Sequence, residues 1–173
     1  MKILLFGSIM VCSFIFLSSF SLSQNSQKNN TNCCLFWQSK IDPTLGKSKT
    51  YEDPLSLADD EVLLAIDCLL KLEGNKNEAS FGGAVNPQVS SVPQFTAVEV
   101  SALYYISYLY YQKFDHASIV ALDDSSGEFS TQNAITEAYQ SYRKWFEEVK
   151  KIGLAKAREQ KLEPLAHTRV KWY

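Results

Sequence analysis

The sequence predicts an all-α domain of four to five packed helices, arranged as a bundle or a short stack, with one long irregular loop. Hydrophobic residues make up 46% of the chain and aromatic residues 13%, more than a disordered protein carries. Seven glycines and five prolines are too few for a sandwich of many short strands, which needs frequent turns. Apolar residues recur at helical spacing, so we expect residues 33–173 to form a single helical domain.

The first 23 residues have the pattern of a secretory signal peptide. Lys2 precedes an apolar run, 3–17, and the small residues Ser21 and Ser23 stand just before Gln24. We expect cleavage after Ser23 and a secreted or periplasmic product. The run is shorter than the roughly 20 residues of a membrane span, so an uncleaved anchor is the less favoured alternative and no span is expected after cleavage.

Two further features complete the prediction for the N-terminal region. A bacterial lipoprotein signal places a small residue directly before its acceptor cysteine. Val11, which precedes Cys12, is a poor fit to this pattern, so lipidation is not expected. Residues 24–32 are polar throughout, which is typical of a flexible linker.

The cleaved chain would keep three cysteines, Cys33, Cys34 and Cys68. An oxidising compartment permits a disulfide, and the odd number leaves one thiol over. We expect Cys68 to pair with Cys34 or Cys33, which would stabilise the fold by roughly 3–4 kcal/mol in the chain-entropy model. A ring between the adjacent cysteines is the less favoured alternative. Because no further ligand follows at metal-binding spacing, a metal site is not predicted.

The first long helix is expected to begin at Ser56, whose hydroxyl would cap the backbone amide of Asp59. Its apolar stripe is broad enough to predict contacts on two sides; it contains Val62, Leu63, Leu64, Ile66, Leu69, Leu70 and Leu72. Gly74 should end the helix. Residues 75–95 then form the longest stretch without helical periodicity, which predicts a functional loop or, as a weaker alternative, a short hairpin.

Thr96 and Glu99 have the spacing of a capping box at the start of a second helix. Residues 97–114 are apolar or aromatic nearly all round, as expected for a central helix. Five tyrosines of this helix cannot all bury their hydroxyl groups without partners, so some should reach the surface or a polar pocket; they are Tyr104, Tyr105, Tyr108, Tyr110 and Tyr111.

A polar break at 123–127 precedes a third long helix, expected from Ser130 or Thr131 to about Ile152. Its predicted buried stripe consists of Ile135, Ala138, Tyr139, Tyr142, Trp145, Phe146, Val149 and Ile152. Gly153 should end or kink this helix, and a shorter one should continue over 154–162. The tail, 165–173, is expected to be irregular, with Trp172 and Tyr173 docked on the domain.

Charge is unevenly distributed along the chain. Residues 42–137 carry a formal charge of −10, whereas residues 140–173 carry +5. We expect the two regions to attract each other within the fold, although such asymmetry could also steer a partner. Nothing is basic enough to predict nucleic-acid binding.

Catalytic candidates are few. His116 follows Asp115, and Glu99 lies on the second helix, so a small secreted hydrolase or transferase with a site near His116 and the 75–95 loop is one alternative. Adjacent helical residues point in different directions, and spacing alone therefore does not let Asp115 orient the histidine. The sequence contains no motif for a metal or cofactor.

Binding candidates lie on the 75–95 loop and the tyrosine-rich helix. Phe81, Gly82 and Gly83 mark a bend in the loop. Tyr104, Tyr108 and Tyr111 would give a large contact area with few rotamers, which suits recognition of a protein or glycan. The competing interpretation, which the sequence favours, is that these tyrosines belong to the core.

The segment 59–75, an acidic start followed by an aliphatic run and Leu72-Glu73-Gly74, resembles one helix of a HEAT-type repeat, and 96–111 could be its neighbour. The resemblance implies stacked helices and a binding role. We therefore expect an exported, non-enzymatic interaction protein, including the inhibitor or immunity class, without a cofactor. A structural component of the cell envelope is the other alternative to the secreted enzyme.

Overall fold

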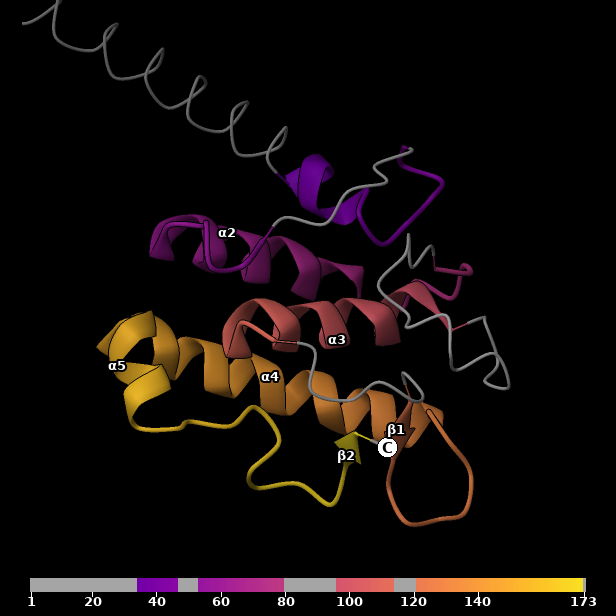
Figure 1. Ribbon diagram of the computed structural model, residues 1–173. Helices are drawn as coiled ribbons and strands as arrows, with labels where there is room; N and C mark the ends of the chain where they lie inside the picture. The colour runs from indigo at the N-terminus through magenta and orange to yellow at the C-terminus, as the bar shows by residue number, and fades with distance from the viewer. Residues whose placement is uncertain (1–33, 47–52, 80–95, 114–120, 173) are drawn as a thin grey trace, which may run out of the picture. The chain divides into compact units, whose positions relative to one another are not determined.

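The computed structural model describes residues 34–46, 53–79, 96–113 and 121–172, all within the compact unit Cys34–Tyr173. The predicted signal peptide and linker lie outside the described residues. The described residues are mostly helical and contain one two-stranded sheet, which confirms the all-α prediction (Figure 1). None of the described helices is long and apolar enough to cross a bilayer.

Helix α2, Asp59–Leu69, continues into the 3-10 helix η1, Leu70–Leu72. The helix begins three residues later than the expected start at Ser56. The Glu61 carboxylate accepts a hydrogen bond from the Ala58 backbone amide at 3.0 Å, whereas the Ser56 hydroxyl donates to the Asp53 carbonyl at 2.7 Å in the preceding turn. The capping group is therefore Glu61, acting backward along the chain.

The short helix 34–38 lies on α2, on the side away from α4 (Figure 1). A disulfide joins Cys34 to Cys68, with the two Cα atoms 4.9 Å apart, so the open choice between Cys33 and Cys34 falls on Cys34. The Gln38 side-chain amide also donates to the Cys68 carbonyl at 3.0 Å, and Trp37 is buried in the core. These contacts give α2 the second packing side that its broad apolar stripe predicts.

Helix α3, Val98–Tyr111, lies between α2 and α4 (Figure 1). Most of its residues are buried, as expected for a central helix. The expected capping box at Thr96 is wrong in position, because Ala97 precedes the helix and the Glu99 carboxylate accepts from the backbone amide of Gly74 at 2.8 Å. A tertiary contact therefore takes the side chain that local capping would have used.

Helix α4, Gln132–Ile152, begins and ends as predicted. The Thr131 hydroxyl accepts from the Ala134 amide at 3.1 Å, and Gly153, with φ +89°, separates α4 from α5, Leu154–Glu159. The predicted stripe of α4 is buried except for half-buried Ile152. Helix α5 ends earlier than the expected Leu162.

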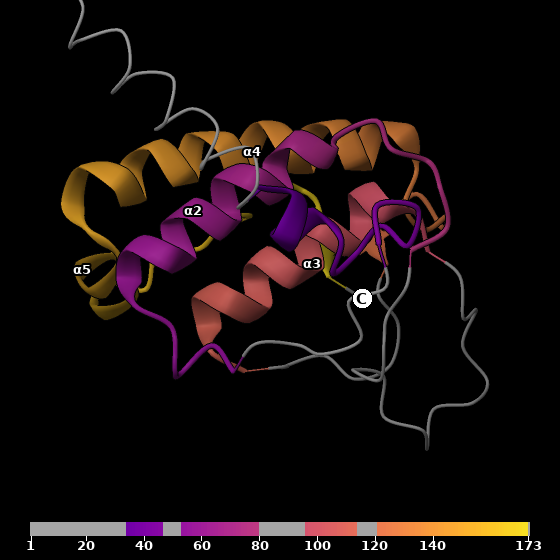
Figure 2. The ribbon, with the colours of Figure 1, turned by 90° about the horizontal axis from the view of Figure 1, so that it is seen from above.

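Of the three long helices, α3 runs antiparallel to α2 and in the same direction as α4 (Figure 2). Arg158 of α5 bonds the Leu109 and Tyr110 carbonyls at 3.1 and 2.9 Å and pairs with Asp59 at 3.5 Å, which places the end of α3 beside the start of α2. Helices α2 and α3 are therefore antiparallel. Tyr139, early in α4, donates to the Glu99 carbonyl at 2.9 Å, so α4 starts where α3 starts and runs in the same direction.

The tail, 165–173, was expected to be irregular, but it contains a short strand. Strand β1, Leu122–Asp123, pairs antiparallel with β2, Lys171–Trp172. This pairing fixes the C-terminal segment across α4, and it confirms the expected docking of Trp172. Tyr173 lies outside the described residues.

Among the residues that the structure describes, four ion pairs join the acidic region to the basic region, as the charge distribution predicts. Each connects a carboxylate from 42–137 with a cation from 140–173: Arg143 with Glu73, Arg158 with Asp59, Arg169 with Glu137, and Lys171 with Asp123. All are partly exposed, so each contributes at most about 1 kcal/mol. Together they favour closure of the C-terminal half onto the N-terminal half.

Candidate functional site

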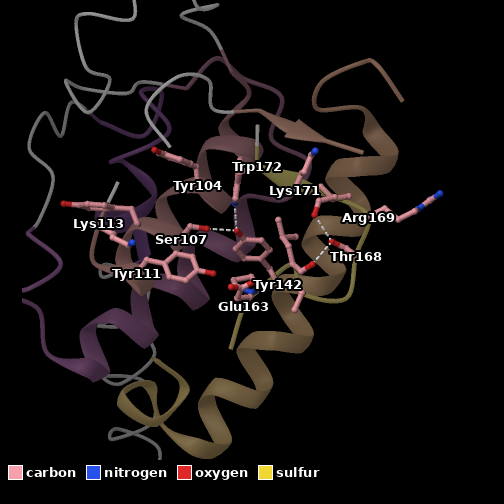
Figure 3. A pocket seen from close by; sticks show the side chains of 15 residues that line it. Tyr104, Ser107, Tyr111, Lys113, Tyr142, Glu163, Thr168, Arg169, Lys171 and Trp172 are labelled. Atoms are coloured by element: carbon pink, nitrogen blue, oxygen red, sulfur yellow. Dashed lines mark hydrogen bonds between the residues drawn. The ribbon is translucent and has the colours of Figure 1, made fainter. Parts of the chain in front are cut away.

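A pocket of about 550 Å³ lies between α3, α4 and the C-terminal segment (Figure 3). This volume falls within the roughly 300–1,000 Å³ typical of small-molecule sites. One wall comes from α3, the floor from Tyr142 of α4, and the other wall from residues 163–172. We call this cavity the tyrosine pocket. The lining residues are Tyr104, Ser107, Tyr108, Tyr111, Lys113, Tyr142, Glu163, Pro164, Leu165, Ala166, Thr168, Arg169, Val170, Lys171 and Trp172.

The α3 wall follows from helical spacing. Tyr104, Ser107, Tyr108 and Tyr111 follow the helical spacing i, i+3, i+4, i+7, which places them on one face of the helix. Exposure rises along this face, from Tyr104, which is buried, to Tyr111, which is 37% exposed. The wall therefore offers aromatic rings at increasing depth, from the mouth of the pocket inward.

The floor is a buried chain of polar groups. The Ser107 and Tyr142 hydroxyls share a hydrogen bond of 2.6 Å, and the Trp172 indole N–H donates to the Tyr142 oxygen at 3.1 Å (Figure 3). Burial raises the pKa of Tyr142 to about 12, although the hydrogen bonds to Ser107 and Trp172 oppose the rise. Tyr142 is therefore a neutral hydroxyl at physiological pH, held in place from two sides.

The C-terminal wall is irregular backbone fixed by specific contacts. The Ser141 hydroxyl of α4 donates to the Pro164 carbonyl at 2.5 Å, and the Thr168 hydroxyl bonds the Leu165 and Val170 carbonyls at 2.9 Å each. Trp172 packs edge-on against Tyr104, with ring centroids 5.5 Å apart. The segment is thus held at both ends, and the space beneath it remains open.

Cations outnumber carboxylates around the tyrosine pocket. Among the lining residues, Lys113, Arg169 and Lys171 are basic and Glu163 is acidic. Arg169, whose side chain is 87% exposed, lies 4.0 Å from Glu137, at the limit of an ion pair. The Lys171 ammonium lies 3.4 Å from Asp123. Two of the three cations in the lining are therefore paired with carboxylates of the acidic region, 42–137.

The structure brings three predicted binding residues together. Tyr104, Tyr108 and Tyr111 all line the tyrosine pocket. The other binding candidates, Phe81, Gly82 and Gly83, lie outside the described residues, as does His116. The ends of the 75–95 loop are joined, because the Ala79 amide donates to the Thr96 carbonyl at 2.9 Å.

Glu99, the second catalytic candidate, is not a lining residue of the pocket. Its side chain is 1% exposed, pairs with the Lys76 ammonium, and accepts from the Gly74 amide. Gly74 has φ +82°, a left-handed conformation that favours glycine. The contacts of Glu99 thus hold the turn after η1 against the start of α3.

Most of the C-terminal wall was not predicted. Trp172 was expected to dock, but no role was expected for Glu163, Arg169 or Lys171. Glu163 and Arg169 lie on irregular backbone and Lys171 in a strand of two residues, where no periodicity indicates which side chains face a cavity. The one available signal was composition, since Trp172 follows two cations, Arg169 and Lys171.

The described lining of the pocket is poor in groups that act as general acids or bases near neutral pH. Its described lining contains one carboxylate and no histidine, and the Ser107 hydroxyl bonds a tyrosine, not a general base. Within the described ranges, His, Cys, Asp and Glu side chains form no group of three or more that could hold a metal ion.

No known protein family matches this chain, and no curated protein or solved structure matches it either. What can be said of the class therefore rests on geometry: an all-α protein with an aromatic pocket that a C-terminal segment covers.

Proposed function

We propose that this protein is a non-enzymatic binding protein whose recognition site is the tyrosine pocket. The observation that carries the proposal is the position of Tyr104, Tyr108 and Tyr111 on one wall of a cavity of about 550 Å³. Tyrosine gives a large contact area with few rotamers to immobilise, and it is enriched among residues that dominate binding energy.

The surroundings of these tyrosines support a preorganised site. The floor is fixed by the Ser107, Tyr142 and Trp172 hydrogen bonds, and α3 is buried on most of its circumference. A site held by rigid helices loses little conformational entropy when its ligand binds. The ligand therefore meets a surface already close to its bound shape.

We further propose that the protein works outside the cytoplasm, after cleavage following Ser23. The Cys34–Cys68 disulfide supports this location, since such bonds persist mainly in secreted and periplasmic proteins. The apolar leader with its small-residue exit supports it independently.

Site-specific photo-crosslinking tests the proposal. Benzoylphenylalanine is placed at Tyr111, at the mouth of the pocket, and in a matched protein at Phe36, which is also exposed but does not line the pocket. Each protein is irradiated in the extracellular and envelope fractions of its source, and adducts are identified by mass spectrometry.

We expect a defined adduct, protein or glycan, at position 111 and none of the same mass at position 36. Trp172→Ala, which removes the indole from the floor, should abolish the adduct while circular dichroism shows a helical protein. No adduct at 111, or the same adduct at both positions, would overturn the proposal.

A further inference from the structure

We infer that the tyrosine pocket binds a quaternary ammonium group, a nitrogen whose positive charge is spread over the carbon atoms bonded to it. The inference rests on the proposed function and deepens it by naming the chemical group that the ligand presents. Three properties of the pocket point to this group: its aromatic rings, the way its polar groups are bonded, and the positions of its charged side chains.

The aromatic rings of the pocket come from three separate elements. Tyr104, Tyr108 and Tyr111 belong to α3, Tyr142 to α4 and Trp172 to β2, so rings border the cavity on both walls and on the floor. The face of an aromatic ring carries partial negative charge and attracts a cation that lies within about 6 Å of its centre. Because a quaternary ammonium presents its charge equally in all directions, rings on several sides suit it.

Several hydrogen-bonding groups of the pocket are already bonded within the protein. The Tyr142 hydroxyl is held by Ser107 and Trp172, and the Thr168 hydroxyl bonds two carbonyls of its own segment. A primary ammonium has three N–H donors that need acceptors, and a saccharide has many hydroxyls that need partners. A quaternary ammonium has no N–H group. The lining therefore suits a cation that needs ring surfaces and not hydrogen bonds.

The cations of the C-terminal wall do not direct their charge into the cavity. Arg169 and Lys171 lie 4.0 and 3.4 Å from carboxylates of Glu137 and Asp123. Figure 3 shows the Arg169 side chain directed away from the cavity. These two side chains therefore leave the space between the rings open to a cation.

Glu163 gives the pocket a carboxylate at its mouth. Its residue is exposed, and Figure 3 shows its side chain beside the rings of Tyr111 and Tyr142. Lys113 lies on the other side of the Tyr111 ring in the same view. A quaternary ammonium placed between Tyr111 and Tyr142 would thus have ring surfaces around it and a negative charge next to it.

The surroundings of the α3 wall are acidic as well. Burial raises the pKa of Tyr108, and the negative charge of nearby Asp53 raises it further. Residues 42–137, which include this wall, carry a formal charge of −10. This excess of negative charge attracts cations to this part of the chain and repels anions.

The test compares three probes of nearly the same shape by NMR titration of the purified protein. The probes are choline, the neutral alcohol in which carbon replaces the choline nitrogen, and the anion tert-butylacetate. We expect choline to bind at least about tenfold more tightly than the alcohol, because the two differ only in charge, and the anion to bind most weakly.

Two matched pairs of variants assign the effect to the pocket. Glu163→Gln should reduce the preference for choline over the alcohol by at least about threefold. Glu148→Gln, which changes the net charge equally on an exposed residue of α4 outside the pocket, should keep it. Tyr111→Leu should reduce the preference, whereas Tyr111→Phe, which keeps the ring, should keep it. The NMR spectrum of each variant reports whether it is folded.

Two further probes distinguish the molecules that carry such a group. Phosphocholine represents a headgroup, and trimethyllysine represents a protein side chain. Tighter binding of either probe than of the neutral alcohol supports the inference, and the tighter of the two indicates the carrier. The mass of the adduct formed at position 111 then identifies it.

The outcomes separate this inference from the proposed function. Equal binding of choline and the alcohol, tighter binding of the anion, or no binding of choline would each overturn the quaternary ammonium assignment. A preference that survives both Glu163→Gln and Tyr111→Leu would overturn it as well. If crosslinking at position 111 succeeds in these cases, the binding function stands. If crosslinking at 111 also fails, both proposals fall.

Discussion

Helix α3 is covered on two sides by segments of opposite character. Helix α2 covers it with small and aliphatic side chains, and the covering is reinforced by the Cys34–Cys68 disulfide. The segment 163–172 covers it with irregular backbone, a tryptophan and polar contacts, and about 550 Å³ remains open beneath. Helix α2 packs against α3 through a periodic aliphatic surface, whereas the path of 163–172 leaves a cavity beside α3. The less closely packed side of α3 is the side that we propose for binding.

The largest expected effect tests how strongly the α2 side depends on its disulfide. Cys34→Ser combined with Cys33→Ser should lower the free energy of unfolding by about 3–4 kcal/mol, because the bridge closes a loop of 34 residues. Urea unfolding followed by circular dichroism measures the change. Cys33→Ser alone should unfold like the unmodified protein, and a loss of similar size in that control would contradict the pairing with Cys34.

High pH should lower the stability of the fold through two buried tyrosines of α4. Burial raises the pKa of Tyr142 to about 12 and that of Tyr139 well above its usual range. Because these pKa values are higher in the folded state, their stabilising effect is complete below pH 10 and is lost as pH rises toward 12. At pH 11 we expect a loss of about 1.4 kcal/mol from each of the two tyrosines.

Urea titrations at pH 8 and pH 11 measure this loss. Tyr142→Phe should make the loss between the two pH values smaller by about 1.4 kcal/mol. It should also cost about 1 kcal/mol at pH 8, where Ser107 and Trp172 lose their partner. An unchanged free energy of unfolding at pH 11 would contradict the burial of these hydroxyls.

Arg158 links the helix ends on the α2 side, and its removal should have an intermediate effect. Its guanidinium satisfies two carbonyls at the end of α3, so Arg158→Met should cost about 2 kcal/mol. The matched variant Arg169→Met removes an exposed cation at the pocket rim and should change the free energy of unfolding by less than about 0.5 kcal/mol. Equal effects in a thermal or urea melt would show that Arg158 has no special structural role.

The smallest effect concerns the ion pairs that join the two halves. Their partial exposure means that 1 M NaCl should lower the free energy of unfolding by less than about 1 kcal/mol at neutral pH. Equilibrium unfolding with and without salt measures this change. A loss of several kcal/mol would mean that electrostatic closure, not burial, holds the C-terminal segment.

The bounds of an element were predicted correctly where local signals in the sequence agree. Helix α4 has a hydroxyl cap at Thr131, a one-sided apolar stripe and a terminal glycine, and all three signals agree with the observed helix. The charge distribution likewise predicted contacts between the acidic and basic regions. The predicted start of α3 was wrong because the Glu99 carboxylate accepts a hydrogen bond from a distant turn, at Gly74. No local pattern reveals this contact.

Only the α3 wall of the candidate site was predictable from the sequence. Helical spacing placed Tyr104, Tyr108 and Tyr111 on one face, but it did not show whether that face would be filled by another helix or left hollow. The answer depends on the path of 163–172, which is set by individual hydrogen bonds such as that from Ser141 to Pro164. Residues on irregular backbone carry no period from which a position could be derived.

The position of Arg158 has a consequence for the order in which the chain assembles. Residues 59–111 contain both helices whose ends this guanidinium joins, yet Arg158 follows Tyr110 by 48 residues. Until α5 docks, the α2–α3 hairpin lacks the contact that closes this end. A chain cut before α5 would therefore leave the last carbonyls of α3 without the Arg158 guanidinium.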